Sequence, residues 1–239
     1  MKAKSIEIIK APDSAKPYLI IYKAAGLPSA PISPDDKENA FCLAASLFPQ
    51  LLEVKGRKEI EYGLLHRLDT ATSGLMIIAA NQQAYDFLMN EQKEGRIIKK
   101  YRASCNINKE VFPGQDFEIS SYFRAYGPGR KEVRPVSPDS SKIILSKVEK
   151  PRLYTTKIKI LEVDKVKKIA QVECQIDNGY RHQVRSHLAW IGLPVEGDLL
   201  YNPQYKNKSA EIMKFCASAL SFEYPRGDLN SYDRKDTWT

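Results

Sequence analysis

The stretch LLHRLDTATSGLMII, residues 64–78, decides how this chain folds. Two apolar runs, Leu64–Leu68 and Leu75–Ala80, each have about the length of one strand, so the stretch predicts two strands with a polar loop between them. The loop holds Asp69, small hydroxyl residues and Gly74, which are residue types that form tight turns. A carboxylate in such a loop is either a turn former or a positioned reagent. The loop taken alone favours the turn former.

Residues His66–Asp69 and Thr72–Leu75 resemble the H-R-L-D-x-x-T-S-G-L signature of the RluA-type pseudouridine synthase family. Eight positions match within a frame of ten residues. In that family the aspartate is the catalytic residue, so the resemblance implies that Asp69 is catalytic. Arg67 lies two residues before it and is expected to contact RNA, because a guanidinium plane stacks well on bases.

Size and charge agree with an RNA-binding protein. The chain has 239 residues, enough for a sizeable core, and 37 Lys and Arg against 29 Asp and Glu give a net charge of +8. A basic surplus favours a polyanionic partner through counterion release, although a solvated basic face would give the same composition. No apolar run approaches the length needed to span a bilayer, and the N-terminus lacks the apolar region of a secretory signal. We therefore expect a cytoplasmic protein with no membrane contact.

The cysteine and histidine pattern argues against a metal site. The four cysteines are far apart and form no C-x-x-C pair, so free thiols in a reducing compartment are expected. The three histidines, His66, His182 and His187, do not cluster with them as zinc ligands would.

Secondary structure follows from periodicity and from capping residues. Residues 1–17 form a polar arm, in which Pro12 and Pro17 oppose regular structure. A helix is expected to start at Ser33-Pro34, and a second to run from an Asn81 cap to about Glu94. Strands are expected at Tyr18–Tyr22, Arg96–Ala103, Thr155–Val163 and Lys168–Ile176.

Residues 112–152 are the least informative part of the chain. They contain a basic loop and several prolines but no clear periodicity. Arg124, Arg130, Lys131 and Arg134 form either an RNA-backbone contact surface or a solvated loop, and the sequence favours neither.

Lys100-Tyr101-Arg102-Ala103 resembles the family's K-x-Y-x-A segment, whose tyrosine packs beside the target base. The resemblance therefore implies that Tyr101 is a catalytic residue. The residues taken alone favour a strand tyrosine with its ring in the core.

Residues 179–188 resemble the family's G-R-T-H-Q-I-R-x-H-L segment, in a helix expected from Tyr180 to Ile191. The resemblance implies that Arg185 is the partner of the Asp69 carboxylate. It also implies substrate contacts for His66, Arg181, His182 and Gln183, although structural roles compete for both histidines. The chain departs from the family at Tyr180-Arg181, where Arg-Thr is usual. The match continues over residues 192–201 as G-x-P-x-x-G-D-x-x-Y.

The resemblance covers roughly residues 18–225. It implies an α+β fold with a long mixed, mainly antiparallel sheet, flanking helices and a central catalytic cleft. Residues 18–239 would form a single pseudouridine synthase domain, without an S4-type module and acting as a monomer. The implied function is isomerisation of specific uridines in rRNA or tRNA, with base flipping and without any cofactor.

Two other functions compete with this one. A catalytically inactive RNA-binding protein of the same fold is one alternative: the altered Tyr180-Arg181 pair keeps it open, whereas the presence of Asp69, Tyr101 and Arg185 argues against it. A hydrolase is the other, but the chain has no G-x-S-x-G elbow and no H-E-x-x-H motif.

Overall fold

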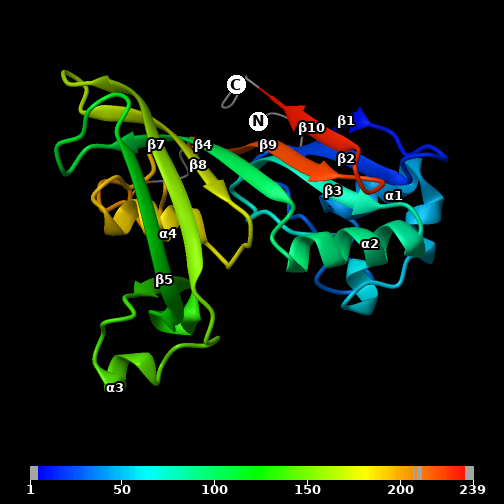
Figure 1. Ribbon diagram of the computed structural model, residues 1–239, viewed down its shortest axis with the longest axis horizontal. Coiled ribbons are helices and arrows are strands. Elements are labelled where there is room, and N and C mark those ends of the chain that lie inside the picture. Colours follow the sequence, from blue (N-terminus) through cyan, green and yellow to red (C-terminus); the bar gives the residue numbers. More distant parts are fainter. Residues whose placement is uncertain (1–4, 207, 209–211, 235–239) are drawn as a thin grey trace. The chain divides into compact units, whose positions relative to one another are not determined.

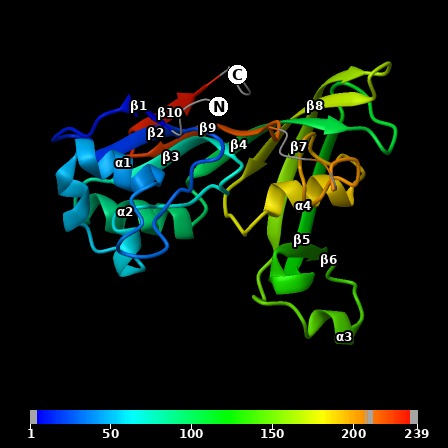
Figure 2. The same ribbon diagram turned by 180° about the vertical axis from the view of Figure 1, so that it is seen from behind.

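The computed structural model describes residues 5–206, 208 and 212–234. Residue contacts divide the chain into two compact units, each described by itself: residues up to 99 with those from 216 onward, and residues 100–215. Strands dominate both units, with a few short helices (Figure 1 and Figure 2). Within the described residues the strand pairs are mainly antiparallel, and a parallel pair occurs among them, which confirms the predicted fold class.

The first unit contains one side of the strand order, β1-β2-β3-β9, with β10 added on β9. The β3–β9 pair is parallel and its neighbours are antiparallel. Within the predicted polar arm residues 6–10 form a strand, whereas Pro12–Pro17 is irregular as predicted. The strands are β1 (Ile6–Lys10), β2 (Tyr18–Lys23), β3 (Ser73–Ala79), β9 (Phe215–Glu223, whose first residue belongs to the second unit) and β10 (Leu229–Asp233).

Two helices complete the first unit, α1 (Ala40–Leu47) and α2 (Gln82–Lys93), with 3-10 turns at Pro49–Glu53 and Glu59–Glu61. The α2 prediction is confirmed: the Asn81 side chain accepts the N–H of Ala84 at 2.8 Å. The helix expected at Ser33 begins instead at Ala40. Asn39 caps it by accepting the N–H of Cys42 at 2.9 Å, and the preceding residues form turns.

The prediction of a strand at Leu64–Leu68 is wrong. Only an isolated bridge joins Leu64 to Ile78 of β3, so residues 64–68 do not form a regular strand pair with β3. The Ser29 hydroxyl explains the irregularity, because it accepts the N–H of Leu68 at 2.9 Å and donates to the Leu68 carbonyl at 2.7 Å. A side chain thus satisfies both backbone groups that a strand would have used.

The second unit has the strand order β4-β8-β7-β5-β6. Helix α4 (Gln183–Trp190) packs against β6 and β7 and is shorter than the helix expected over residues 180–191. The uninformative residues 112–152 contain two strands and a short helix, α3 (Lys142–Leu145), that the sequence did not predict. The strands are β4 (Ile98–Asn106, whose first two residues belong to the first unit), β5 (Asp116–Tyr126), β6 (Glu132–Val136), β7 (Tyr154–Asp164) and β8 (Ile169–Ile176).

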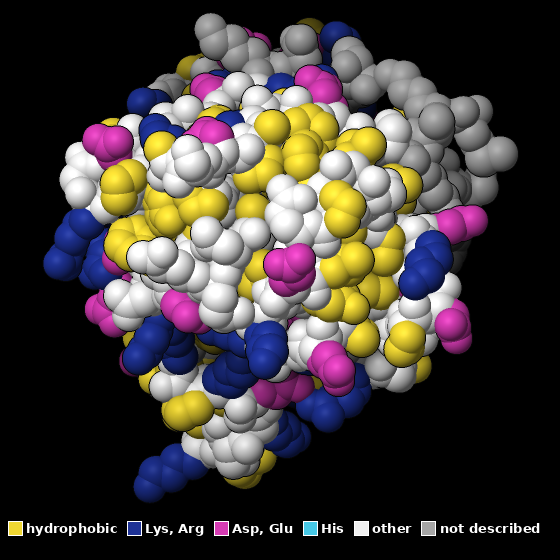
Figure 3. Space-filling view, turned by 90° about the vertical axis from the view of Figure 1, so that its right-hand side faces the viewer, with side chains coloured by type: hydrophobic (Ala, Val, Ile, Leu, Met, Phe, Trp, Pro, Cys, Tyr) yellow, Lys and Arg dark blue, Asp and Glu magenta, His cyan; other side chains and the backbone are white. Residues whose placement is uncertain are grey.

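The hydrophobic core of the first unit is formed by side chains of its strands and helices. Every residue of β3 is buried, and α2 adds Leu88 and Tyr85 to the same core. Some apolar side chains of this unit stay exposed, among them Ile32, Leu47 and Leu52. In Figure 3, which shows the right-hand side of Figure 1, hydrophobic side chains are interspersed with charged ones. Over the described part of the chain, no helix has the length and apolarity that crossing a bilayer requires.

Candidate active site

The loop that holds Asp69 is fastened on both sides within the first unit. On one side Ser29 binds both backbone groups of Leu68. On the other side the Thr70 carbonyl accepts the N–H of Gly26 at 2.8 Å. The Asp69 carbonyl accepts the N–H of Thr72 at 3.0 Å, which closes the turn. The backbone of Asp69 therefore forms the turn that the loop sequence favours, and the role of its carboxylate as a reagent stays a prediction.

Lys23 is a buried cation beside this loop that the sequence analysis missed. Its side chain is fully buried, and Nζ donates to the carbonyls of Leu27 at 2.7 Å, Ala24 at 3.0 Å and Thr70 at 3.3 Å. Burial lowers the pKa of Lys23 to about 7, against the Asp69 carboxylate, which acts to raise it. Lys23 thus binds the loop backbone and also places positive charge near the carboxylate.

His66 and Arg67 precede Asp69 but differ in environment. His66 Nε2 accepts the N–H of Ile77 at 3.3 Å, and burial, with the Lys99 ammonium, lowers the pKa of His66 well below its ordinary value. A neutral imidazole bound to a strand supports the structural role. Arg67 is 57% exposed and pairs with Glu61 at 2.9 Å, so its guanidinium is at the surface.

Tyr101 lies on β4 in the second unit and is buried, with 8% of its surface exposed. Its ring stacks on Phe215, with the ring centres 5.2 Å apart and the planes at 7°. The Phe215 ring fixes the plane of the tyrosine, which is the arrangement that a stacking surface for a flat base requires.

Arg185 lies on α4 and forms a buried ion pair with Asp198. Nε and Nη2 donate to the two carboxylate oxygens, both at 2.8 Å, and the side chains are 6% and 0% exposed. Asp198 also accepts the backbone N–H groups of Leu200 at 2.9 Å and Tyr201 at 3.2 Å. Burial acts to raise the pKa of Asp198, but the Arg185 guanidinium and these N–H groups outweigh it and hold that pKa below its usual value. The pair fixes the guanidinium plane through two parallel bonds.

Tyr201 connects this pair to the start of α4. Its ring lies 5.3 Å from the Arg185 guanidinium carbon, and its hydroxyl lies 2.9 Å from Nδ1 of His182. The hydroxyl also accepts the N–H of Val133 at 2.8 Å. His182 itself adopts the left-handed conformation (φ 55°), which is uncommon for a residue with a Cβ. The tyrosine thus supports a strained histidine next to the buried arginine.

The residues that depart from the family pattern connect α4 to the β5–β6 region. Tyr180 stacks on Phe123, with ring centres 4.8 Å apart, and its hydroxyl donates to Glu149. Arg181 Nη2 donates to the carbonyls of Arg130 at 2.8 Å and Glu132 at 3.3 Å. A threonine at 181 would be too short to reach the two carbonyls that Arg181 binds.

Gln183 makes contacts of the capping kind. Its Oε1 accepts the N–H of Tyr180 at 2.9 Å, and Nε2 donates to the Thr155 carbonyl at 2.9 Å and to the Thr156 hydroxyl at 3.1 Å. These bonds support a structural role, and its substrate contact stays a prediction. Among the described residues, no group of three His, Cys, Asp or Glu side chains could hold a metal ion.

The structure brings Arg181, His182, Gln183 and Arg185 together at α4, and it brings His66, Arg67 and Asp69 together beside β3. The sequence missed Lys23, Ser29 and Asp198. The match over residues 192–201 includes Asp198 but assigned it no partner. The joint action of Asp69, Tyr101 and Arg185 stays a prediction.

Two solved structures share this fold. Human RNA pseudouridylate synthase domain containing 1 matches 98% of this chain and 84% of its own, with a TM-score of 0.70 and 20% identity. Human RNA pseudouridylate synthase domain containing 4 matches 91% and 85%, with a TM-score of 0.60 and 18% identity. At these identities the likeness defines the fold.

The sequence defines the family. Residues 17–190 match the RNA pseudouridylate synthase family, so the chain belongs to it, and the RluA-type resemblance is confirmed. A Bacillus subtilis protein described as uncharacterized RNA pseudouridine synthase YlyB is 29% identical over 164 residues, 69% of this chain and 48% of its own length. Ribosomal large subunit pseudouridine synthase D of Buchnera aphidicola subsp. Baizongia pistaciae is 28% identical over 166 residues, 66% of this chain and 46% of its own length. The chain thus spans about half the length of these relatives.

Proposed function

We propose that this protein is an RNA pseudouridine synthase that isomerises uridines in ribosomal or transfer RNA. The observation that supports the proposal best is the Asp69 loop, in which the family signature lies on a turn fastened by Ser29, Gly26 and Lys23. Such bonds hold the backbone that carries the proposed reacting carboxylate, and a fixed backbone favours a defined catalytic geometry.

The reaction needs no oxidant and no group donor. The C1′–N1 bond of uridine breaks, the uracil turns, and a C1′–C5 bond forms. The C5 proton leaves and N1 ends protonated, so atoms and electrons balance within the nucleoside. We propose that Asp69 acts on the sugar, either as the nucleophile at C1′ or as the base that removes a sugar proton.

The other residues take supporting roles in this proposal. Arg185, whose Nε and Nη2 donate to Asp198, is the proposed partner of the Asp69 carboxylate, because a guanidinium has further N–H donors for a second carboxylate. Tyr101, held flat by Phe215, packs on the flipped uracil and accepts the C5 proton. The exposed Arg67 fills the gap that the flipped base leaves, which offsets part of the unstacking cost of a few kcal/mol.

Tritium release tests the proposal. Ribosomal and transfer RNA labelled at C5 of uridine is prepared from cells that lack the protein, and release into water is measured. Wild type should release tritium and Asp69→Asn should not. Asp86→Asn removes an exposed carboxylate from α2 of the same unit and should match wild type. Absence of release from both RNA pools, with a folded wild-type protein that binds RNA, would support the catalytically inactive alternative.

A further inference from the structure

Two arginines face each other at the distal end of the β5–β6 hairpin. The register pairs Arg124 on β5 directly with Arg134 on β6, so their side chains lie on the same face of the hairpin. Tyr126 lies two residues further along that face and is 36% exposed. Its ring lies 3.2 Å from the guanidinium carbon of Arg134 and 5.3 Å from that of Arg124. We name these three residues the arginine–tyrosine face.

This arrangement is electrostatically unfavourable in the protein alone. Like charges directly opposite on an antiparallel pair destabilise it, and the electron-rich tyrosine ring offsets only part of the repulsion. Within the described part of the chain, neither Arg124 nor Arg134 forms an ion pair with a carboxylate. Glu132 is opposite Tyr126 and is the acidic residue that the register places on this face. The face therefore has an excess of positive charge, which a bound anion would neutralise.

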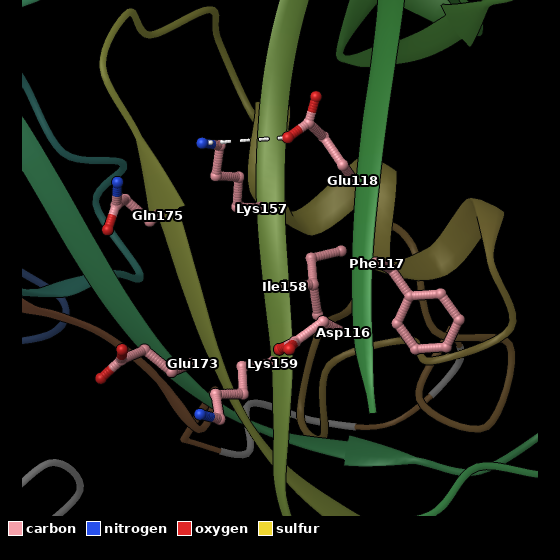
Figure 4. A pocket seen from close by; sticks show the side chains of 8 residues that line it. All are labelled: Asp116, Phe117, Glu118, Lys157, Ile158, Lys159, Glu173 and Gln175. Carbon is pink, nitrogen blue, oxygen red and sulfur yellow. Dashed lines mark ion pairs between the residues drawn. The ribbon is translucent and has the colours of Figure 1, made fainter. Parts of the chain in front are cut away.

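On the surface formed by β5, β7 and β8 of the same unit, by contrast, positive and negative side chains alternate. A shallow hollow of about 440 Å³ lies over β5, β7 and β8 (Figure 4). There the register sets Lys159 between Asp116 and Glu173, and Lys157 opposite Glu118, with Lys157 Nζ 3.9 Å from the Glu118 carboxylate. Each lysine has an acidic neighbour, so this surface is neutralised by its own side chains. It serves as the control for the arginine–tyrosine face.

We propose that the arginine–tyrosine face binds the phosphodiester backbone of the RNA substrate. Planar guanidiniums match phosphate oxygens with two parallel bonds each, and the partly exposed aromatic ring beside them can contact a neighbouring base. Such contacts position the RNA without selecting its sequence. An acidic protein segment would satisfy the charge, but it would make no use of the aromatic ring that lies beside the two guanidiniums. The inference rests on the proposed function, because it assigns the substrate of that function a second contact surface.

Salt-dependent binding of a fluorescein-labelled RNA stem-loop tests this proposal. The measurement uses the full chain with Asp69→Asn, so that turnover does not interfere. The variant Arg124→Gln/Arg134→Gln is compared with Lys157→Gln/Lys159→Gln, which removes the same number of charges from the same unit. The arginine variant should lower the slope of log Kd against log salt by about 2 and weaken binding roughly tenfold or more at low salt. The lysine variant should change both quantities much less.

Two further measurements keep the result interpretable. Arg124→Lys/Arg134→Lys preserves the charge but not the planar fork, so it should restore most of the salt slope and only part of the affinity. Circular dichroism and thermal melting establish that each variant is folded. Equal slopes for the arginine and lysine variants would overturn the proposal and favour a partner other than RNA. Tritium release separates the two proposals: an inactive wild type whose RNA binding depends on Arg124 and Arg134 refutes the enzyme and supports the face.

Discussion

The pair between Arg185 and Asp198 gives the sharpest prediction on stability and activity together. Asp198→Asn keeps the shape of the side chain and an oxygen for the N–H groups of Leu200 and Tyr201, but it removes the negative charge. Arg185, with 6% of its side chain exposed, would then be a buried cation without its bidentate partner. Breaking a buried pair from one side costs about 3–5 kcal/mol. If Asp69 is also a partner of the guanidinium, as we propose, the loss of unfolding free energy should lie near the lower end of that range.

Urea unfolding at neutral pH measures this loss. Asp164→Asn is the control, because Asp164 pairs with Lys167 at 3.3 Å on the surface, and its unfolding midpoint should stay near that of wild type. A double-mutant cycle of Asp198→Asn with Arg185→Met should give a coupling energy of about 2–3 kcal/mol. A loss below about 1 kcal/mol for Asp198→Asn would refute the reasoning, since it would mean that the charge of the pair is not desolvated.

The same variant tests the proposed site. If Asp198 holds Arg185 for the benefit of Asp69, Asp198→Asn should reduce kcat for tritium release while the Kd for RNA changes little. A cycle of Asp198→Asn with Asp69→Asn should then be non-additive in stability, because both carboxylates would share one guanidinium. Additive losses would argue against contact between Asp69 and Arg185.

Three more outcomes follow from single contacts. Burial lowers the pKa of His187 to about 4, below the ordinary value of 6.5. As the pH drops from 6.5 toward 4, the unfolded state therefore binds a proton that the folded state does not, and the free energy of unfolding decreases. Urea unfolding at pH 8 and pH 5 should show that His187→Gln removes about 2 kcal/mol of this pH dependence, and an unchanged dependence would contradict the assignment. Gly74 has φ 134°, and a Cβ there would lie 2.4 Å from the Ala217 carbonyl oxygen, so Gly74→Ala should destabilise by about 2–4 kcal/mol in the same assay. Gly26→Ala, with nothing within 4 Å, should cost clearly less, and equal losses would mean that the close approach does not matter. Arg67→Ala should alter stability by less than about 1 kcal/mol but slow tritium release from folded RNA about tenfold, and unchanged release would eliminate its stacking role.

The sequence predicted correctly those helices and strands whose backbone hydrogen bonds follow a regular local pattern. The α2 helix followed from the Asn81 cap, and the two strands near residues 155–176 followed from alternation. The prediction of a strand at Leu64–Leu68 was wrong because a distant residue, Ser29, forms hydrogen bonds with both backbone groups of Leu68. An apolar run shows that a segment is buried, but it does not show which atoms satisfy its polar backbone.

The β5–β6 hairpin was missed for a related reason. Its strands contain Arg124, Arg134 and Pro135, so their composition is that of a loop. The inward side chain Phe123 packs on Tyr180 and Tyr154, which are distant in sequence. These aromatic contacts supply the burial that the hairpin's own sequence lacks. The departure at Tyr180 is therefore connected to the hairpin, because the residue that replaces the family's arginine stacks on the hairpin core.

The buried charges show why residue roles are harder to predict than motifs. Asp198 lies within a matched motif, but its role depends on a chain reversal between α4 and residue 198. Gly197 allows part of that path: it has φ 80°, and a Cβ there would lie 2.5 Å from the Ile212 carbonyl oxygen. Lys23 lies in no polar cluster of the sequence, and only the folded turn gathers three carbonyls around its ammonium. In both cases backbone geometry built from distant segments creates the charge environment, so a motif locates the reactive residues while the fold determines how they are held.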